Sequence, residues 1–212
     1  MLKKNISNSV KLLKYYKLIN FNLIYNNKAI NRYKKDNYEI SEDKSKKLEL
    51  LKKEIMNLKN CELKKQAKNI VFCDGNPKSK IMLIGEAPGA NEDQEGLPFV
   101  GRAGILLDKM LAAIRLDRKK VYISNIINYR PPDNRRPTEE EIKRYLPFII
   151  KHIEIINPKI LILLGSTAMN ALIGKDVVIS KMRGQWIEKK IGNCKTSIII
   201  TFHPAFLISN QL

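Results

Sequence analysis

The sequence predicts an α/β protein with three layers, α/β/α, around a central four-stranded, mainly parallel sheet. Four short apolar runs are continuous rather than alternating, as expected of strands that are covered on both faces. Segments with apolar residues at helical spacing separate these runs, and strands that alternate with helices are typical of a parallel sheet. With 44% hydrophobic residues among 212, the chain can bury a sizeable core, which excludes a wholly disordered or fibrous protein.

The predicted strands and helices alternate along the second part of the chain. The strands are expected at residues 81–84, 121–127, 160–164 and 197–202. The helices between them are expected at residues 103–114, 138–153 and 167–173. Thr138 and Glu141 have the spacing of a capping box and mark the start of the second helix. Pro147 should bend this helix or shorten its first segment, because proline removes a backbone donor.

Residues 1–60 are predicted to form a basic N-terminal extension ahead of a domain at residues 61–212. The extension holds 15 Lys and Arg against 6 Asp and Glu. An amphipathic helix is expected near residues 44–59, where apolar side chains recur at helical spacing: Leu48, Leu51, Ile55 and Leu58. Residues 1–43 are weakly patterned, so a mobile basic arm and a poorly ordered helix both stay open, and no role is assigned to them.

The composition favours a polyanionic partner and a reducing compartment. The formal net charge is +18, and a positive surface that neutralises phosphates gains affinity because counterions are released. A compositional bias towards lysine, asparagine and isoleucine explains the charge equally well. The three cysteines, Cys61, Cys73 and Cys194, are too sparse for a disulfide framework, so we expect a cytoplasmic protein. No apolar run approaches the roughly 18 residues that a membrane span needs, so no membrane partner is expected.

Polar residues follow three of the predicted strands. Glu86 follows the first, Asn125 lies within the second, and His203 follows the fourth. Ligands of such sheets bind beyond the carboxyl ends of the strands, so a carboxylate, an amide and an imidazole are expected to converge on one crevice.

Each of these residues also has a structural interpretation. Glu86 lies among glycine and proline and fits a tight turn. Asn125 lies on an apolar strand, where its amide fits a structural hydrogen bond to a loop backbone. Phe99 lies in a turn-rich loop, where it fits either a buried core side chain or a stacking platform for a planar ring. His152 lies on a helix beside isoleucines and is interpreted as structural, whereas His203 before a proline is better placed for ligand contact.

Five linked motifs, in order and with consistent spacing, identify a resemblance that covers residues 61–212. They are Gly85-Glu86-Ala87-Pro88-Gly89, Pro98-Phe99-Val100-Gly101-Arg102-Ala103-Gly104, Tyr122-Ile123-Ser124-Asn125, Arg130-Pro131-Pro132-Asp133-Asn134-Arg135 and His203-Pro204-Ala205. Together they resemble the family 4 uracil-DNA glycosylases. The resemblance implies a DNA repair enzyme that hydrolyses the N-glycosidic bond of uracil in DNA and leaves an abasic site. The target base must be flipped out of the duplex into a pocket.

The resemblance also implies roles for the pocket residues. Phe99 would stack on uracil, Asn125 would pair with its polar edge, and His203 would donate to the O2 oxygen as negative charge develops on the departing base. The backbone of Gly85, Glu86 and Ala87 would line the pocket. Glu86 is the first candidate for positioning the attacking water and Glu92 the second, and the sequence does not choose between them.

Further residues are expected at the DNA itself. Phe206 or Leu207 would wedge into the duplex where the base leaves. Arg130, Arg135 and Arg136, held by prolines, are candidate phosphate contacts. We expect the protein to be a monomer whose partner is uracil-containing DNA.

The chain departs from the family at two places. Family members hold a four-iron four-sulfur cluster on four cysteines, but only Cys61 stands at a matching position, with Lys64, Tyr129 and Tyr145 at the other three. We therefore expect no cofactor and no metal. Only 9 residues follow His203, so a shortened C-terminus without a closing helix is expected, and whether it leaves the enzyme active stays open.

Two alternatives stay open beside an active glycosylase. One is a non-catalytic DNA-binding remnant of the same fold. The other is a relative with altered base specificity, such as hypoxanthine, or one that traps the abasic product covalently; the missing histidine between Arg130 and Pro137 speaks against the covalent variant.

Overall fold

The computed structural model describes residues 36–174 and 178–209, with side chains from residue 44 onward. Contacts divide the chain into two units, Met1–Glu39 and Ile40–Leu212, and the sheet lies in the second. The helices are α2 (Asp36–Met56), α3 (Glu62–Gln66), α4 (Ala90–Glu95), α5 (Arg102–Ala113), the 3₁₀ turn η1 (Pro132–Asn134), α6 (Glu139–Ile156), α7 (Ser166–Leu172), α8 (Ile179–Met182) and α9 (Pro204–Ser209). The strands are β1 (Asp74–Gly75), β2 (Ile81–Gly85), β3 (Tyr122–Asn125), β4 (Ile160–Leu164), β5 (Trp186–Ile191) and β6 (Cys194–Thr201).

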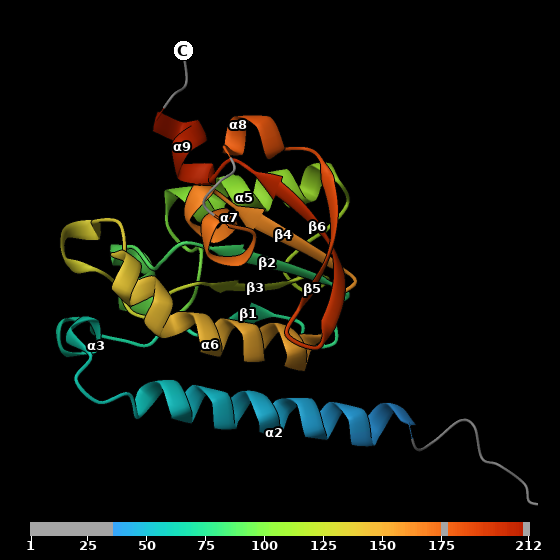
Figure 1. Ribbon diagram of the computed structural model, residues 1–212, viewed down its shortest axis with the longest axis horizontal. Helices are drawn as coiled ribbons and strands as arrows, with labels where there is room; N and C mark the ends of the chain where they lie inside the picture. Colours follow the sequence, from blue (N-terminus) through green and yellow to red (C-terminus); the bar gives the residue numbers. More distant parts are fainter. Residues whose placement is uncertain (1–35, 175–177, 210–212) are drawn as a thin grey trace, which may run out of the picture. The chain divides into compact units, whose positions relative to one another are not determined.

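The strands form one sheet in the order β1-β3-β2-β4-β6-β5 (Figure 1). The four central strands run parallel, and the two edge strands run antiparallel to their neighbours. The register sets Gly85 opposite Asn125 and Leu164 opposite Thr201, so all four parallel strands end at one edge of the sheet. The predicted α/β/α class is confirmed.

The predicted strand number was wrong, because the sheet has six strands rather than four. β1 has two residues and no apolar pattern to reveal it. β5 alternates between exposed and half-buried residues, as expected of an edge strand with one solvated face, so it lacks the continuous apolar run. The Gly192-Asn193 pair between β5 and β6 is a hairpin signal that could have revealed this strand.

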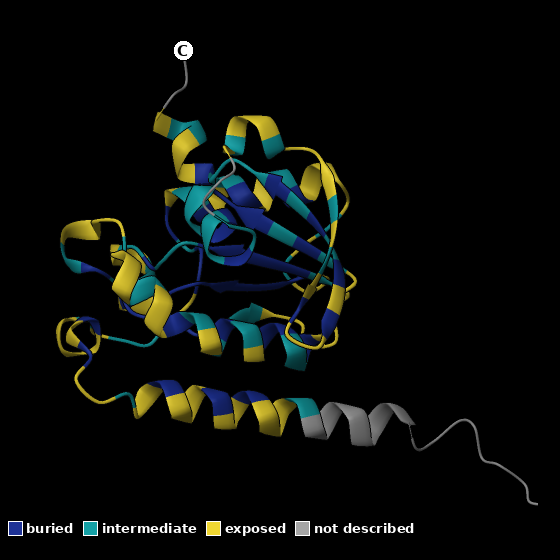
Figure 2. Ribbon diagram, viewed as in Figure 1, coloured by how far each residue is buried: buried dark blue, intermediate teal, exposed yellow. Residues whose placement is uncertain are grey.

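The middle of the sheet is covered on both faces, and Figure 2 shows β2 and β3 largely in dark blue, with buried and half-buried residues mixed along β4 and β6. On one face, Met82, Ile84 and Tyr122 belong to the large core that α2, α6 and α7 also enter. On the other face, Leu83 and Ile123 pack with Leu107 and Leu111 of α5, among others, in a second core. Because successive side chains of a strand point to opposite faces, strands between two helical layers need apolar residues at every position.

Helices α5 and α7 begin and end within one residue of their predicted bounds. Helix α6 opens with the predicted capping box and runs on through Pro147 to Ile156, although its ribbon changes direction part-way along (Figure 1). The strand expected at residues 121–127 ends at Asn125, because the next backbone N–H groups turn to donate to the carbonyls of Gly85 and Glu86.

Helix α2 begins eight residues before the expected start at residue 44. Its apolar stripe is buried in the large core, and Lys151 of α6 pairs with Glu54 at 2.8 Å. The domain boundary at residue 60 stays a prediction, and residues 1–35 of the expected extension lie outside the described residues. Within the described part of the chain, no helix is long and apolar enough to span a membrane.

Candidate active site

Three strand ends deliver the predicted side chains to one cavity of about 200 Å³. Glu86 follows β2, Asn125 ends β3, and His203 lies two residues after β6. Phe99 reaches the same cavity from the loop before α5. The structure therefore brings these four predicted residues together, and the second candidate carboxylate, Glu92, also lines the cavity. The cavity is smaller than the 300–1,000 Å³ typical of drug-sized ligands and suits a single planar ring.

Phe99 forms one wall of the cavity and is 5% exposed. Its ring stacks on the His203 ring with centroids 5.6 Å apart. Gly85 allows this wall to come close to Asn125, since a Cβ at Gly85 would lie 2.5 Å from Phe99 Cζ and 2.4 Å from Asn125 Oδ1. Hence only glycine fits at the end of β2 with both side chains in place.

Asn125 is 2% exposed, and its Oδ1 has no hydrogen-bond partner among the described residues. A buried polar atom without a partner costs about 1–3 kcal/mol. The expected structural bond to a loop backbone is not made by this oxygen. The geometry instead leaves a buried acceptor beside the cavity, where a ligand donor can satisfy it.

His203 has a defined neutral tautomer. The backbone N–H of Ala205 donates to its Nδ1 at 3.2 Å, which leaves Nε2 to carry the ring proton. Burial lowers the pKa of His203, and the negative charges of Glu86 and Glu92 only partly oppose this. The imidazole therefore stays neutral at pH 7 and presents one N–H donor.

The two candidate carboxylates have different surroundings. Both line the cavity, and Thr167 Oγ1 donates to Glu86 Oε2 at 2.5 Å. Glu92 accepts three backbone N–H groups, from Gly89 at 3.1 Å, Val100 at 2.9 Å and Gly101 at 2.8 Å. Glu92 thus ties the Phe99 loop to the start of α4, and its oxygens are occupied.

The arginine-rich loop lies at the rim of the cavity. Arg130 Nε donates to Asn134 Oδ1 at 2.8 Å, and Asn134 and Arg135 both line the cavity. Arg135 also forms a two-point pair with Glu141 of α6 at 2.7 and 2.9 Å. This pair fixes the direction of the guanidinium but reduces its capacity for a further anion. Arg136 is exposed beside it.

The candidate wedge residues lie on α9. Phe206 is 49% exposed and its ring lies 5.1 Å from that of Phe202, while Leu207 is half-buried. The guanidinium of Arg183 lies over the Phe202 ring, 4.8 Å from its centroid. This end of the molecule therefore combines aromatic and cationic groups.

Two kinds of comparison relate the chain to known proteins. A model of the uracil DNA glycosylase superfamily matches residues 72–212. A type-4 uracil-DNA glycosylase of Thermotoga maritima is 40% identical over 165 residues, which are 77% of this chain and 84% of that protein. Another from Saccharolobus solfataricus is 42% identical over 77% of this chain and 78% of its own length.

The chain belongs to the type-4 family of the uracil-DNA glycosylase superfamily. The predicted family is confirmed. In this glycosylase family member, Asn134 at the cavity and Thr167 at Glu86 were not among the predicted site residues. Thr167 had a weak signal, because it follows Gly165 and Ser166 at the end of a predicted strand, the edge where ligands bind.

The residues at the family's cluster positions do not fit an iron–sulfur cluster. Cys61 Sγ lies 3.3 Å from Tyr145 Oη in a buried hydrogen bond, and burial raises the pKa of both Tyr129 and Tyr145. These phenols stay protonated at neutral pH, and the Lys64 ammonium, which donates to the carbonyl of Met56, has no lone pair for iron. No group of three or more His, Cys, Asp or Glu that could hold a metal occurs among the described residues.

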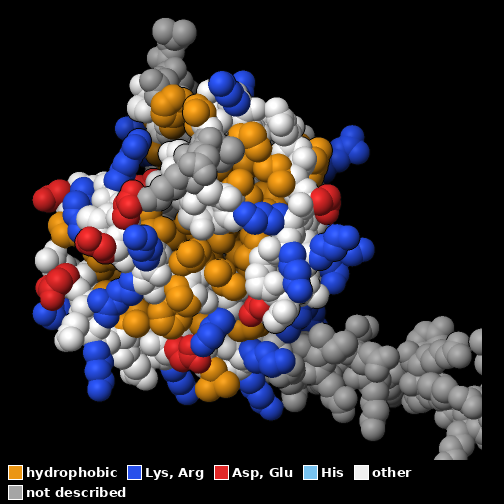
Figure 3. All heavy atoms as spheres, in the orientation of Figure 1, with side chains coloured by type: hydrophobic (Ala, Val, Ile, Leu, Met, Phe, Trp, Pro, Cys, Tyr) orange, Lys and Arg blue, Asp and Glu red, His pale blue; other side chains and the backbone are white. Residues whose placement is uncertain are grey.

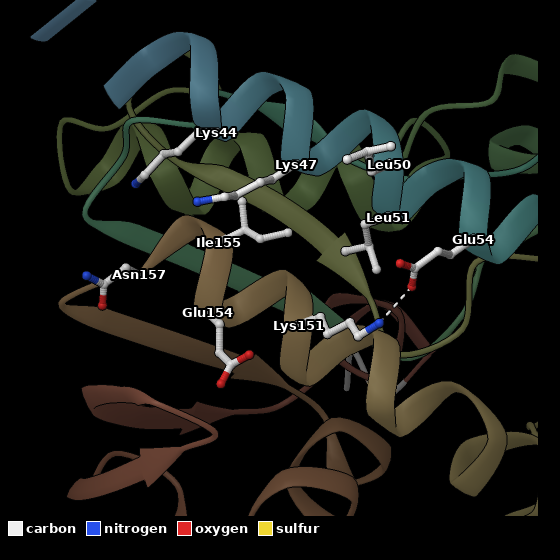
Figure 4. Close-up of a pocket in the computed structure, with 9 residues that line it drawn as sticks. All are labelled: Lys44, Lys47, Leu50, Leu51, Glu54, Lys151, Glu154, Ile155 and Asn157. Atoms are coloured by element: carbon white, nitrogen blue, oxygen red, sulfur yellow. Dashed lines mark hydrogen bonds and ion pairs between the residues drawn. The ribbon is translucent and has the colours of Figure 1, made fainter. Parts of the chain in front are cut away.

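A larger cavity of about 550 Å³ lies between α2 and α6 (Figure 4). Leu51 and Ile155 contribute apolar side chains to it, and the Lys151–Glu54 pair crosses one end. The described residues that line it include no imidazole or thiol, and both of its acids are bonded, Glu54 to Lys151 and Glu154 to the backbone N–H of Asn193. The smaller cavity at the strand ends is therefore the candidate active site.

Proposed function

We propose that this protein excises uracil from DNA by hydrolysing its N-glycosidic bond, as the names of its relatives suggest. The observation that carries the proposal is the buried, unpartnered Oδ1 of Asn125 beside a cavity sized for one base. An acceptor there matches the N3–H donor of uracil, and the amide nitrogen matches its O4 acceptor. Cytosine has an acceptor and a donor at the same two positions and is rejected by this pairing.

The flipped base stacks on Phe99 while Asn125 pairs with its edge. Stacking does not distinguish between bases, because every base has a π face. Selectivity therefore comes from Asn125, and Phe99 contributes binding energy and alignment. The backbone of Gly85, Glu86 and Ala87 completes the pocket.

His203 stabilises the leaving base. Its neutral ring directs the Nε2 proton towards the O2 oxygen, where negative charge develops as the bond to deoxyribose breaks. A fixed donor in a site that excludes water stabilises such charge without reorganising during the reaction. Removing one donor of this kind typically lowers a rate by about 10²–10³.

Glu86 positions the attacking water in this proposal. Both Glu86 and Glu92 line the cavity that holds His203 and Asn125, but Thr167 holds only one oxygen of Glu86, which orients the other. Glu92 is less suited because three backbone N–H groups already occupy its oxygens. We assign Glu92 to holding the Phe99 loop.

The DNA backbone contacts Arg130, Arg135 and Arg136, and Phe206 or Leu207 enters the space that the flipped base leaves. Charge does not locate this surface by itself, because Lys and Arg are spread over the face seen in Figure 3 while hydrophobic side chains gather in its middle. We propose that the protein acts without an iron–sulfur cluster. The monomeric state and the cytoplasmic location stay predictions.

An oligonucleotide with a single uracil, followed by alkaline cleavage of abasic sites, tests the proposal. We expect the wild type to cleave it, and Asn125→Ala and His203→Ala to lose at least about 100-fold in rate. Gln66→Ala, which removes an exposed amide on α3, is the matched control and keeps the full rate. Binding of the oligonucleotide without excision would instead identify a DNA-binding remnant, and release of hypoxanthine but not uracil would identify a changed base preference.

A further inference from the structure

Arg118 lies outside the cavity, in the loop between α5 and β3, yet its guanidinium contacts the loop that carries Phe99. Its Nη1 donates to the carbonyl of Pro98 at 3.0 Å, and its Nη2 donates to the carbonyl of Phe99. Two carboxylates also accept from the same guanidinium: Asp74 from Nη1 at 2.7 Å and Asp108 from Nε at 2.8 Å. One side chain thus joins β1, α5 and the Phe99 loop.

The Phe99 backbone has an unusual conformation that needs such support. Its φ is +57°, in the left-handed region that non-glycine residues rarely adopt. Its carbonyl points at α5, where a Cβ at Gly104 would lie 1.6 Å from the oxygen. The strained turn, the glycine under it and the arginine bonded to it together fix the direction of the Phe99 ring.

A direct role of Arg118 at DNA does not fit these contacts. Its side chain is 24% exposed, and two carboxylates surround the single positive charge, so the cluster carries net negative charge. Such a cluster does not attract a phosphate. The use of Nε, Nη1 and Nη2 together also requires the planar fork of arginine, which lysine lacks.

We propose that Arg118 is a positioning residue, which acts through Phe99 to align the base-stacking ring with the flipped uracil. This inference rests on the proposed function, because it assumes that Phe99 stacks on the base. Asp74 and Asp108 orient the guanidinium, and Arg118 orients the loop. None of the three touches the substrate.

Steady-state and single-turnover excision of a uracil oligonucleotide test this role in the full chain. Arg118→Met is expected to lower kcat/KM about 10- to 100-fold, as a ring displaced by about 1 Å would. Arg118→Lys keeps the charge but not the fork, and is expected to lose nearly as much. Arg115→Met removes an exposed guanidinium from the same segment, which has no side-chain bond to another of the described residues, and is expected to keep the wild-type rate.

A double-mutant cycle with Phe99→Ala separates positioning from a general loss of structure. If Arg118 acts through the ring, Arg118→Met lowers kcat/KM less than about threefold when Phe99 is already alanine. An equal loss in both backgrounds overturns the proposal, and so does full activity of Arg118→Lys. Asp108→Asn, which removes one exposed partner, gives a milder variant with a smaller loss in the same direction, in case Arg118→Met does not fold.

Hydrogen exchange of residues 97–104 gives a readout that does not depend on catalysis. The amides of Val100 and Gly101 are bonded to Glu92, and we expect them to exchange faster in Arg118→Met than in Arg115→Met. If the wild type does not excise uracil but this difference is found, the proposed function fails and the loop assignment stands. If the wild type excises uracil and exchange is unchanged, the inference about Arg118 fails.

Discussion

Gly85→Ala adds one methyl group at the most crowded point of the site. The added Cβ would lie 2.4 Å from Asn125 Oδ1 and 2.5 Å from Phe99 Cζ, well inside van der Waals contact. Gly85 has an ordinary backbone conformation, so the effect comes from contact alone. Overpacking of this kind costs about 1–3 kcal/mol of stability, and either Asn125 or Phe99 must move to relieve it.

We expect Gly85→Ala to lose about 100-fold in single-turnover excision, since a displacement near 1 Å has that effect on an aligned site. Urea unfolding measures the loss of stability, and alkaline cleavage of the uracil oligonucleotide measures the rate. Gly184→Ala is the control, because Gly184 has φ +78° and no atom within 4 Å of its Cβ position. It should lose about 1 kcal/mol from backbone strain while its excision rate stays unchanged. Excision by Gly85→Ala within twofold of the wild type would refute the packing argument.

Three further changes test other contacts. Thr167→Val should lower the single-turnover excision rate about 10-fold, because it frees the Glu86 carboxylate. Thr167→Ser keeps the hydroxyl and should keep most of the rate. Equal rates for the two variants would contradict the role of Thr167 in orienting Glu86. Burial lowers the pKa of His152 to about 3, below the value near 6.5 of an unfolded chain, so its contribution to stability is complete above pH 6.5 and is lost as the pH falls towards 3. Urea unfolding should show the wild type losing about 1.4 kcal/mol per pH unit more than His152→Gln in that window, whereas parallel curves would exclude the assignment. Tyr145→Phe should lower the free energy of unfolding by about 1 kcal/mol, because it removes the bond to Cys61. Iron analysis of anaerobically purified wild type should find no iron. Four irons per chain would overturn our proposal that the cluster is absent.

The central strands could be predicted because burial on two faces leaves a strong sequence pattern. The runs at β2 and β4 have apolar residues at nearly every position, which only a doubly covered strand requires. β5 could not be recognised in this way, since its polar residues face solvent and its pairing depends on a turn. The short α3, α4, α8 and α9 have too few residues for a helical period to appear.

The cavity residues could be predicted because strand ends meet at one edge of a parallel sheet. Glu86, Asn125 and His203 are separated widely in sequence, but the topology alone brings them together. Their hydrogen-bond partners could not be predicted, because contacts such as those of Glu92 with Val100 and Gly101 depend on the path of a loop. Arg135 illustrates the same limit, since its pairing with Glu141 exists only once the loop folds back on α6.

The neutral state of His203 leads to a prediction about the pH dependence of excision. A charged imidazole would stabilise the departing base more strongly, but it would also place a proton on Nδ1 against the N–H of Ala205. Burial opposes that charge as well, and keeps the pKa below the usual 6.5. The ring therefore acts as a fixed dipole in a water-poor pocket rather than as a cation.

Because the His203 imidazole is already neutral, its protonation state does not change as the pH rises. We expect the single-turnover rate at saturating enzyme to change less than about threefold between pH 6.5 and 8.5. A mechanism that needs protonated His203 predicts a different course, because the active fraction would fall tenfold per pH unit above a pKa that lies below 6.5. The rate would then drop about 100-fold over the same range, and a drop of that size, absent in His203→Asn, would show that the imidazole acts as a cation.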